Sequence, residues 1–273
     1  MAAYSFGGRE KGMLERKRKD TIIRLLELHG VTSIHEVVEA TGASESTIRR
    51  DFGELEDEGL LARVRGGVEL VGEVPHSEAG PDANGQKTEF DMRRAKNQEK
   101  KRRIARTACT LISEGETIFV DGGSTTFHMV EYLTSFSITV VTNSFAVANH
   151  LIKHSQATVI LPEGTVDRDT QLILSYLSAD PFQNYAASKA FMGVEGITDN
   201  ELTNSANLVI QSERAMIAHA RELIILADDS KFGHGGHLTL CPVTKASKII
   251  TTKDADPDMV ASITSRGVEV VQT

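Results

Sequence analysis

Apolar positions divide the chain into a short helical part and a longer part in which helices and strands alternate. Near the N-terminus, Ile22, Leu25 and Leu26 have the i, i+3, i+4 spacing of one helix face and predict a helix over Leu14–His29. The same spacing then recurs and predicts a second helix over Ile34–Thr41. The first part of the chain is therefore expected to begin with two packed helices.

A turn, a third helix and a hairpin complete this first part. Gly42 begins a tight turn, and Ser44 is a natural N-cap for a helix over Glu45–Glu58. Leu60–Val71 then holds two short apolar runs on either side of Arg65-Gly66-Gly67, which predicts a β-hairpin. A short helix, a turn, a helix that opens with serine and a hairpin are the parts of a winged helix-turn-helix.

A segment rich in glycine, proline and polar residues separates this part from the rest. Val71–Gly85 shows no apolar period and predicts a linker. We expect a winged helix-turn-helix domain at residues 13–71, a linker at 72–92 and a larger domain at 93–273. There, helices and strands alternate, which is typical of an α/β fold with a largely parallel sheet. The expected helices are Arg93–Ile112, Thr126–Leu133, Phe145–His154, Ser178–Tyr185, Gln211–Ala220 and Pro257–Arg266, and the expected strands are Thr117–Val120, Ile138–Thr142, Thr158–Leu161, Lys189–Val194, Leu223–Ala227, Lys248–Thr252 and Val268–Val271.

Composition limits the class of protein. The chain has 273 residues, of which 40% are hydrophobic and 25% charged, as in a soluble chain with a core. No apolar run approaches the ~20 residues that span a bilayer, and the N-terminus lacks the apolar segment of a secretory leader. The two cysteines, Cys109 and Cys241, are too few for a disulfide scaffold. We therefore expect a cytoplasmic protein without a membrane partner.

Positive charge is concentrated locally in a chain that is acidic as a whole. The formal net charge is −8, yet Arg93–Arg106 holds eight basic residues and one acid. Within this stretch, Lys100–Arg103 is basic throughout. Such a run can contact DNA or a neighbouring subunit, although a solvated helix face is the commoner outcome.

The third helix has the two faces of a DNA-recognition helix. At 100° per residue, Ile48, Phe52 and Leu55 share one face, and Arg50 lies opposite. Hydroxyl side chains can reach phosphates or base edges, and arginine is the usual bidentate partner of guanine in the major groove. A helical bundle with a solvated arginine pair is the alternative. On the first interpretation, the DNA contacts are Ser44, Ser46, Thr47, Arg49 and Arg50 on the helix, and Arg63 and Arg65 on the hairpin.

A loop in the larger domain has the composition of a phosphate-binding site. Asp121–Thr126 joins an expected strand to an expected helix and contains two glycines and three hydroxyl side chains. Such a loop presents backbone N–H groups and hydroxyls to an anion. The alternative is an ordinary turn whose hydroxyls only cap the helix. The loop is neither a Walker A sequence nor a dinucleotide fingerprint, so no cofactor is expected.

Two further strand ends carry polar groups, and open α/β sheets bind ligands at this edge. One is Thr142-Asn143-Ser144, and the other is Leu226–Phe232, in which Lys231 offers a positive charge. Each has a plain alternative as a surface loop. Together with the glycine-rich loop they predict a shared effector site made of Asp121, Gly122, Gly123, Ser124, Thr125, Thr126, Asn143, Ser144 and Lys231.

Four motifs, two in each expected domain, match one known pattern. They are Ser44–Asp51, Arg63–Gly67, Asp121–Thr126 and Asp228–Gly233. These motifs resemble those of the DeoR family of bacterial sugar-responsive repressors. The resemblance implies that the larger domain is isomerase-like, similar to ribose-5-phosphate isomerase, and binds a phosphorylated sugar or derivative. It also implies that this effector changes the affinity of the protein for a double-stranded DNA operator.

The expected function is therefore a transcriptional repressor of a carbohydrate-utilisation operon that a phosphorylated sugar releases. A homo-oligomer, dimer or tetramer, is expected because recognition helices read successive major grooves in pairs. The alternative is a sugar-phosphate isomerase or deaminase with an appended DNA-binding domain, since binding and isomerase sites share their phosphate-holding parts. The regulator is preferred, and no catalytic residue is expected, because an isomerase does not need a DNA reader. His234, His237 and Cys241 have a spacing that zinc accepts, but no fourth ligand is near, so no metal is expected.

Overall fold

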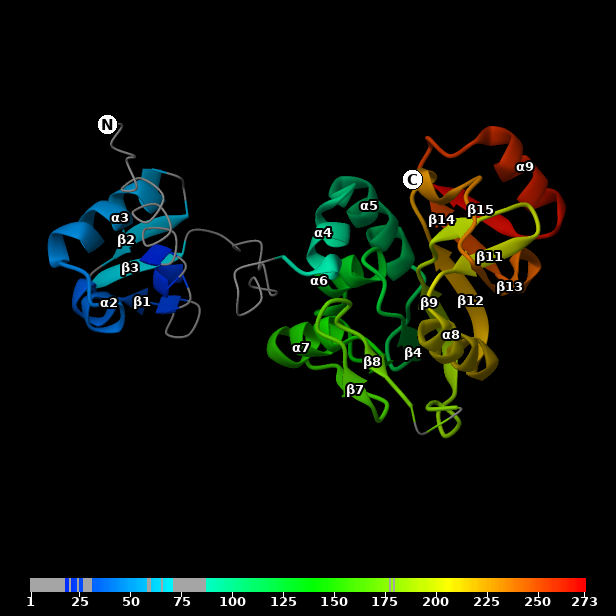
Figure 1. Cartoon of the computed structure of the whole chain (residues 1–273), viewed down its shortest axis with the longest axis horizontal. Helices are drawn as coiled ribbons and strands as arrows, with labels where there is room; N and C mark the ends of the chain where they lie inside the picture. The colour runs from blue at the N-terminus through cyan, green and yellow to red at the C-terminus, as the bar shows by residue number, and fades with distance from the viewer. Residues whose placement is uncertain are drawn as a thin grey trace, which may run out of the picture. The chain divides into compact units, whose positions relative to one another are not determined.

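The computed structural model describes residues 18–19, 21–23, 25–26, 31–57, 60–64, 66–70, 87–176, 178 and 180–273. The chain forms two compact units, Met1–Ser77 and Glu78–Thr273 (Figure 1). None of the helices in the described ranges is long and apolar enough to cross a membrane.

The N-terminal unit is a winged helix. Its elements are β1 (Val31–Thr32), α2 (Ile34–Thr41), α3 (Glu45–Asp57), β2 (Leu61–Val64) and β3 (Gly67–Leu70). The strands form an antiparallel sheet in the order β1-β3-β2. The described residues of the predicted first helix, 18–19, 21–23 and 25–26, are helical, and its other residues lie outside the description. The two later helices and the hairpin are confirmed, whereas β1 was missed because two residues show no alternation.

Local signals and one shared core fix these elements. Ser33 and Glu36 form a reciprocal capping box at the start of α2. A Cβ on Gly67 would lie 2.1 Å from the carbonyl oxygen of Thr32, so glycine is needed for β3 to pair with β1. The predicted apolar faces converge in a single core of Ile22, Leu26, Val37, Ile48, Phe52, Leu55, Leu61 and Val68.

The second unit is built on a seven-stranded sheet in which every neighbouring pair of strands is parallel. Its strands are β4 (Thr117–Val120), β5 (Thr139–Val141), β6 (Thr158–Ile160), β9 (Ala187–Met192), β12 (Ala220–Leu226), β14 (Lys248–Thr251) and β15 (Glu269–Gln272). The order across the sheet is β15-β14-β12-β9-β4-β5-β6. The chain thus starts at β4, moves outward to β6, and then returns to the other side of β4 at β9. The point where strand order reverses, where such sheets bind ligands, lies between β4 and β9.

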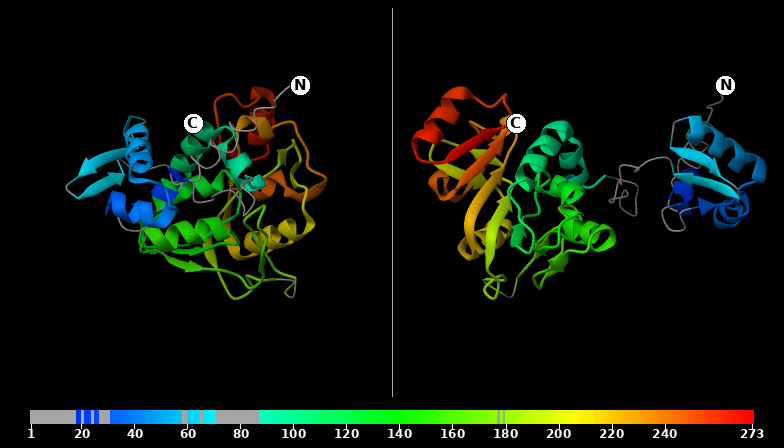
Figure 2. Two further views of the ribbon diagram at one scale, coloured as in Figure 1. Left: turned by 60° about the vertical axis from the view of Figure 1, so that its left-hand side comes forward. Right: turned by 180° about the vertical axis from the view of Figure 1, so that it is seen from behind.

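Helices cover both faces of this sheet (Figures 1 and 2). Alternate strand residues point to opposite faces, so Ile118 packs in one core with Ile104, while Phe119 packs in the other with Met216 and Ile263. The helices are α4 (Glu89–Ala95), α5 (Gln98–Cys109), η1 (Thr126–Met129), α6 (Val130–Leu133), α7 (Phe145–His154), α8 (Asn207–His219), η2 (Asp229–Lys231), η3 (Val243–Lys245) and α9 (Pro257–Ser265). A winged helix followed by an α/β domain with a parallel sheet confirms the predicted fold class.

Two expected helices differ from the structure. The helix predicted over Ser178–Tyr185 is wrong: residues 181–184 form a turn, the other described residues have no regular structure, and the Asp180 side chain accepts the Phe182 N–H at 3.1 Å. The helix predicted over Arg93–Ile112 is two helices, α4 and α5, which meet at Asn97 with a left-handed φ of 56°. Helix α4 begins within the stretch expected to be linker, because Thr88 and Asp91 form a capping box that periodicity does not reveal.

Five short strands were not expected from the sequence. They are β7 (Thr165–Val166) and β8 (Ile173–Leu174), which pair with each other, and β10 (Gly196–Ile197), β11 (Glu201–Asn204) and β13 (Leu238–Pro242), which form an antiparallel sheet. Each is five residues or fewer and carries too little alternation to stand out. The sheet of β10, β11 and β13 packs on one face of the parallel sheet, and Leu202 and Leu240 belong to the core between them.

Candidate DNA-binding surface and effector site

Helix α3 presents its predicted polar face outward. Ile48, Phe52 and Leu55 are buried, as expected, whereas Arg50 is exposed. Ser44 opens the helix: its Oγ accepts the Thr47 N–H at 3.3 Å and lies 2.8 Å from Thr47 Oγ1 and 2.9 Å from Ser46 Oγ. The three hydroxyls therefore lie together at the exposed N-terminal end of the recognition helix.

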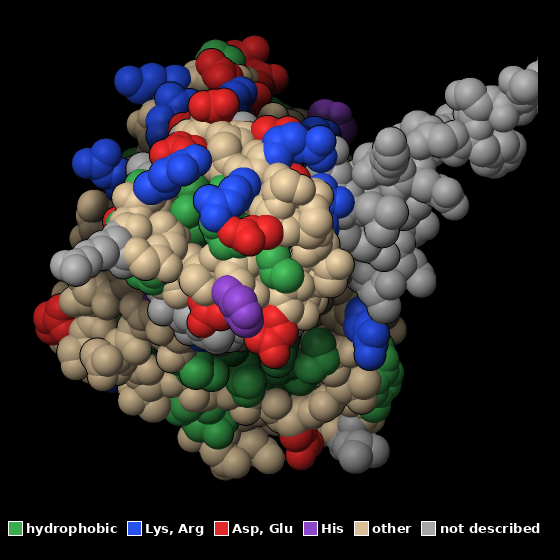
Figure 3. Space-filling model, turned by 90° about the vertical axis from the view of Figure 1, so that its left-hand side faces the viewer, with side chains coloured by type: hydrophobic (Ala, Val, Ile, Leu, Met, Phe, Trp, Pro, Cys, Tyr) green, Lys and Arg blue, Asp and Glu red, His purple; other side chains and the backbone are tan. Residues whose placement is uncertain are grey.

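The arginines of this surface are available to DNA. Arg49, Arg50 and Arg63 have side chains 62–65% exposed. Their partners are exposed glutamates, at 2.5 Å in the Arg49–Glu45 pair and 3.7 Å in the Arg50–Glu54 pair. Such surface pairs contribute little, about 0–1 kcal/mol, so exchanging them for phosphate costs little. Basic and acidic side chains alternate in this way on the face that Figure 3 shows. Arg65, the remaining expected contact, lies outside the described residues.

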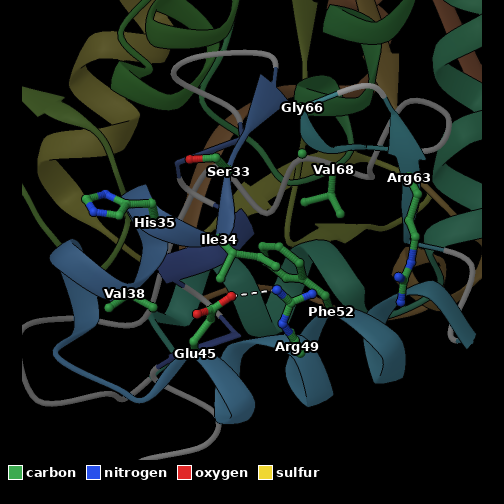
Figure 4. Close-up of a pocket in the computed structure, with 11 residues that line it drawn as sticks. Ser33, Ile34, His35, Val38, Glu45, Arg49, Phe52, Arg63, Gly66 and Val68 are labelled. Carbon is green, nitrogen blue, oxygen red and sulfur yellow. Dashed lines mark hydrogen bonds and ion pairs between the residues drawn. The ribbon is translucent and has the colours of Figure 1, made fainter.

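A cavity of about 610 Å³ lies where α2, α3 and the hairpin meet. Arg49 and Arg63 line it from two elements, and Figure 4 shows Arg49 extended toward Glu45 on the same helix. Phe52 and Val68 give it an apolar wall. The surface predicted to bind DNA is thus concave between α3 and the hairpin.

The aspartate of the Arg-Arg-Asp motif holds the domain together. Asp51 is fully buried, and its two carboxylate oxygens accept hydrogen bonds from the Arg18 guanidinium at 2.8 and 3.1 Å. This bidentate pair ties α3 to the helical residues near the N-terminus. Sequence reasoning missed this role, because nothing in the spacing connects residues 33 positions apart.

The glycine-rich loop of the second unit follows β4, at the point where strand order reverses. The backbone N–H of Asp121 donates to the carbonyl of Phe191 on β9 at 2.9 Å. A Cβ on Gly122 would lie 1.9 Å from Cδ2 of Leu172, so any larger residue there would require the Leu172 side chain to move. Gly123 is half-buried beside Gly193, which follows β9. The loop therefore lies at the strand ends where α/β sheets bind ligands.

The expected hydroxyls differ in availability. Thr126 is buried, and its Oγ1 lies 2.7 Å from the carbonyl oxygens of Asp121 and Gly123. Ser144 is buried and accepts the N–H of Val147 as the N-cap of α7. These two hydroxyls are engaged in turns and caps. Ser124 is half-buried, and the ammonium of Lys101 donates to its Oγ at 3.0 Å, while Thr125 is 7% exposed.

Asn143 and Lys231 contribute further polar groups. Nδ2 of Asn143 lies 3.3 Å from Oδ1 of Asp121, so the second strand end meets the loop. Oδ1 of Asn143 is buried and has no hydrogen-bond partner within the described ranges. Lys231 is half-buried in η2, close enough to Lys101 for its charge to lower the pKa of that residue. The structure therefore places Asn143 against the loop, and it places Lys231 near Lys101, which donates to Ser124 in the loop.

Two buried carboxyl groups adjoin this site. Burial raises the pKa of Asp121, which accepts backbone hydrogen bonds from Gly122 and Gly193. Burial and the nearby charge of Asp121 raise the pKa of Glu213 well above its usual range. Both oxygens of Glu213 lie within 2.7 Å of Nδ2 of Asn204. Sequence reasoning did not assign Glu213 or Asn204 to the site, because an acid on a helix of mixed character carries no signal of burial.

The raised pKa of Glu213 predicts a pH-dependent stability. Folded Glu213 keeps its proton to higher pH than the unfolded chain does, so stability falls as pH rises above the ordinary pKa of 4.5. Glu213→Gln has no such proton. We therefore expect the difference in Tm between Glu213→Gln and wild type to increase by several degrees, in favour of the variant, as the pH is raised from 5 to 8. One pKa unit is worth about 1.4 kcal/mol, and each kcal/mol shifts Tm by roughly 2–4 °C.

Thermal melts across this pH range measure the effect. Glu222→Gln is the control, because Glu222 is exposed on β12 and its replacement should leave the pH profile of wild type unchanged. Parallel Tm curves for Glu213→Gln and wild type would contradict the assignment.

The zinc-compatible spacing near the C-terminus forms no cluster. Nδ1 of His234 lies 2.9 Å from the carbonyl oxygen of Phe232. The described part of the chain contains no group of three or more His, Cys, Asp or Glu side chains placed to hold a metal ion.

Comparison with known proteins identifies both units. Residues 96–253 match the DeoR C terminal sensor domain, which covers more than half of the chain. The chain belongs to the DeoR family. Residues 18–74 match the DeoR-like helix-turn-helix domain, so this DeoR-family protein is a DNA-binding transcriptional regulator with a sugar-responsive sensor.

Relatives of this DeoR-family protein match over nearly its whole length. The HTH-type transcriptional regulators UlaR of Shigella dysenteriae serotype 1 (strain Sd197) and Escherichia coli (strain K12 / DH10B) are 27% identical over 260 residues. The match covers 95% of this chain and 100% of each relative.

Solved structures match the sensor more distantly. Ribose 5-phosphate isomerase A from Methanocaldococcus jannaschii has 18% identity and a TM-score of 0.38, over 50% of this chain and 55% of that one. eIF2B beta from Chaetomium thermophilum has 14% identity and a TM-score of 0.40, over 56% and 48%. The chain spans about half the length of these solved structures.

Proposed function

We propose that this DeoR-family regulator represses a carbohydrate-utilisation operon and leaves its operator when a phosphorylated sugar binds the sensor. Two or more copies place α3 in successive major grooves, so the operator contains repeats or a palindrome. Arg50 reads bases, and Arg49, Arg63 and Arg65 hold the backbone. The exposure of Arg49, Arg50 and Arg63 and the exposed hydroxyls at the start of α3 support this assignment.

The effector site is the glycine-rich loop with the residues around it. Its place at the reversal of strand order carries this proposal, because α/β sheets bind ligands there. Ser124, the backbone of Gly122–Thr125 and Lys231 hold the phosphate, while Asp121 and Asn143 contact sugar hydroxyls. Thr126 and Ser144 position the loop and α7, since their hydroxyls already have partners.

The sensor acts by binding and not by turnover. An isomerase with this site has no need of a recognition helix, whereas a repressor needs both a DNA-binding domain and a sensor. The effector shifts the population away from the DNA-binding state, which requires different affinities in the two states.

A panel of sugar phosphates tests the proposal. Each compound is added to the purified protein beside its unphosphorylated sugar, and thermal stability is measured. A ligand at 100 times its Kd adds about 2.7 kcal/mol of stability, which raises Tm measurably. We expect one sugar phosphate, and not its free sugar, to raise Tm and to release bound DNA.

Two outcomes would contradict the proposal. If no compound of a broad panel shifts Tm, the glycine-rich loop is not a phosphate-binding site. Turnover of the stabilising compound at an enzymatic rate would favour the isomerase or deaminase instead.

A further inference from the structure

Lys101 on α5 is a buried cation that forms no ion pair among the residues that the structure describes. Its side chain lies at one edge of the effector loop, and the residue is 4% exposed. Its ammonium donates to two neutral groups, the carbonyl oxygen of Arg93 and Oγ of Ser124, the second at 3.0 Å. An ammonium has three donors, so one remains for another acceptor. Two carboxylates near this part of α5, Asp229 and Asp254, pair with the adjacent Lys100 instead.

Most of the charged groups that act on Lys101 are positive. Burial, together with the positive charges of Lys231, Arg93 and Lys96, lowers the pKa of Lys101 to about 8. Asp228 opposes this effect, but its carboxylate is shared with Asn97 and Ser230.

A second donor nearby also lacks an acceptor. The Nε–H of Arg93 is buried and has no hydrogen-bond partner in the part of the chain that the structure describes. The charge of Arg93 acts on both Asp121 and Lys101, so this arginine lies beside the loop. The guanidinium of Arg93 is itself 39% exposed, and its Nη1 lies 3.7 Å from a carboxylate oxygen of Glu89, so its charge is already met. Buried charges are ordinarily paired, and it is the buried ammonium of Lys101, with a spare donor, that calls for an anion.

We propose that Lys101 binds the phosphate group of the effector, with Ser124 on the same phosphate. This assignment rests on the proposed function of the loop and extends it to a residue outside the three strand ends. A phosphate dianion supplies the missing charge and accepts the third donor of Lys101.

Lys101 also connects the effector loop to α4, the first helix of the sensor in the sequence. Lys101 also holds the carbonyl of Arg93, in the last turn of α4, and the two helices meet at the left-handed Asn97. Helix α4 follows directly, in the sequence, the residues that lead from the winged helix. A phosphate on Lys101 therefore acts on the junction between α4 and α5, as a sensor must if its ligand is to control the preceding domain.

Calorimetric titration with inorganic phosphate, at constant ionic strength, tests this residue directly. Lys101→Met removes the charge and keeps the length of the side chain. Arg103→Met is the matched control, because it removes a charge from an exposed position on the same helix. We expect Kd to rise by roughly 30-fold or more for Lys101→Met and to stay within about twofold for Arg103→Met, consistent with a lost charge-assisted hydrogen bond.

The pH dependence of wild type provides a readout that needs no variant. Phosphate is mostly a dianion at pH 7.5 and only gains negative charge above it, whereas Lys101, with a pKa of about 8, loses its proton between pH 7.5 and pH 9.5. Phosphate binding should therefore weaken by roughly 20-fold over this range in wild type, by proton linkage, and remain nearly constant in Lys101→Met.

The outcomes separate the two proposals. Equal phosphate affinity in wild type and Lys101→Met, or pH-independent binding by wild type, would overturn the role of Lys101 and leave the loop as the effector site. Absence of phosphate binding by wild type would overturn both.

Discussion

Ser124→Asp is expected to reduce the affinity of the sensor for a phosphorylated effector by roughly 1000-fold. Ser124 lies in the glycine-rich loop, with its Oγ 3.0 Å from the ammonium of Lys101. A carboxylate there would meet the phosphate at close range. Two like charges about 4 Å apart repel by roughly 4 kcal/mol near a protein surface, and every 1.4 kcal/mol is a factor of ten. Operator DNA should then remain bound at effector concentrations that release it from wild type.

Ser124→Ala provides the comparison. It removes one neutral hydrogen bond, worth about 0.5–1.5 kcal/mol, so the affinity should fall by no more than roughly tenfold. The measurement is the Tm shift, or calorimetric Kd, with the sugar phosphate identified in the panel. If Ser124→Asp and Ser124→Ala bind that compound equally well, the phosphate does not lie at this loop.

The elements that the sequence predicts well are those with local signals. Ile34–Thr41 is a helix over the predicted range, because apolar spacing and a glycine stop agree there. The parallel strands were found because both faces of the sheet are covered and each strand reads as a short apolar run. Short antiparallel strands such as Glu201–Asn204 carry no such pattern, since long-range pairing defines them.

The site residues that were missed acquire their roles through packing. Lys100–Arg103 read as a solvated basic face, which is right for exposed Arg103 and wrong for buried Lys101. Both are basic residues of one short run, and only the fold distinguishes them. The sequence does not reveal the raised pKa of Glu213 either, because that pKa depends on burial and on Asp121, far away in the sequence.

The predicted hydroxyls show the opposite error, in which a real motif contains residues with structural roles. Thr126 and Ser144 stand at the expected strand ends, yet their hydroxyls hold the turn and cap α7. The plain alternative, that such residues cap a helix, therefore applies to part of the motif. A glycine-rich loop can thus hold a ligand with some of its residues and shape itself with others.

Asp51→Ala is expected to destabilise the winged helix by about 3 kcal/mol and to abolish DNA binding. Asp51 is fully buried, and the substitution leaves the guanidinium of Arg18, 17% exposed, without its bidentate partner. Removing one member of a buried ion pair typically costs 3–5 kcal/mol. A unit of this size has little stability to lose, so a large fraction should unfold at 25 °C. Hydrogen exchange in the full chain should show lost protection in α2 and α3, with the sensor unchanged.

Arg50→Ala, at the adjacent position, separates loss of folding from loss of recognition. Its side chain is 63% exposed and pairs only loosely with Glu54, at 3.7 Å, so stability should change by less than about 0.5 kcal/mol. A lost base contact costs about 1–3 kcal/mol, so affinity for DNA selected by wild type should fall roughly 5- to 150-fold. If Arg50→Ala binds that DNA as wild type does, the outer face of α3 does not read bases. If Asp51→Ala stays folded, the buried Arg18–Asp51 pair is not what holds α3 in place.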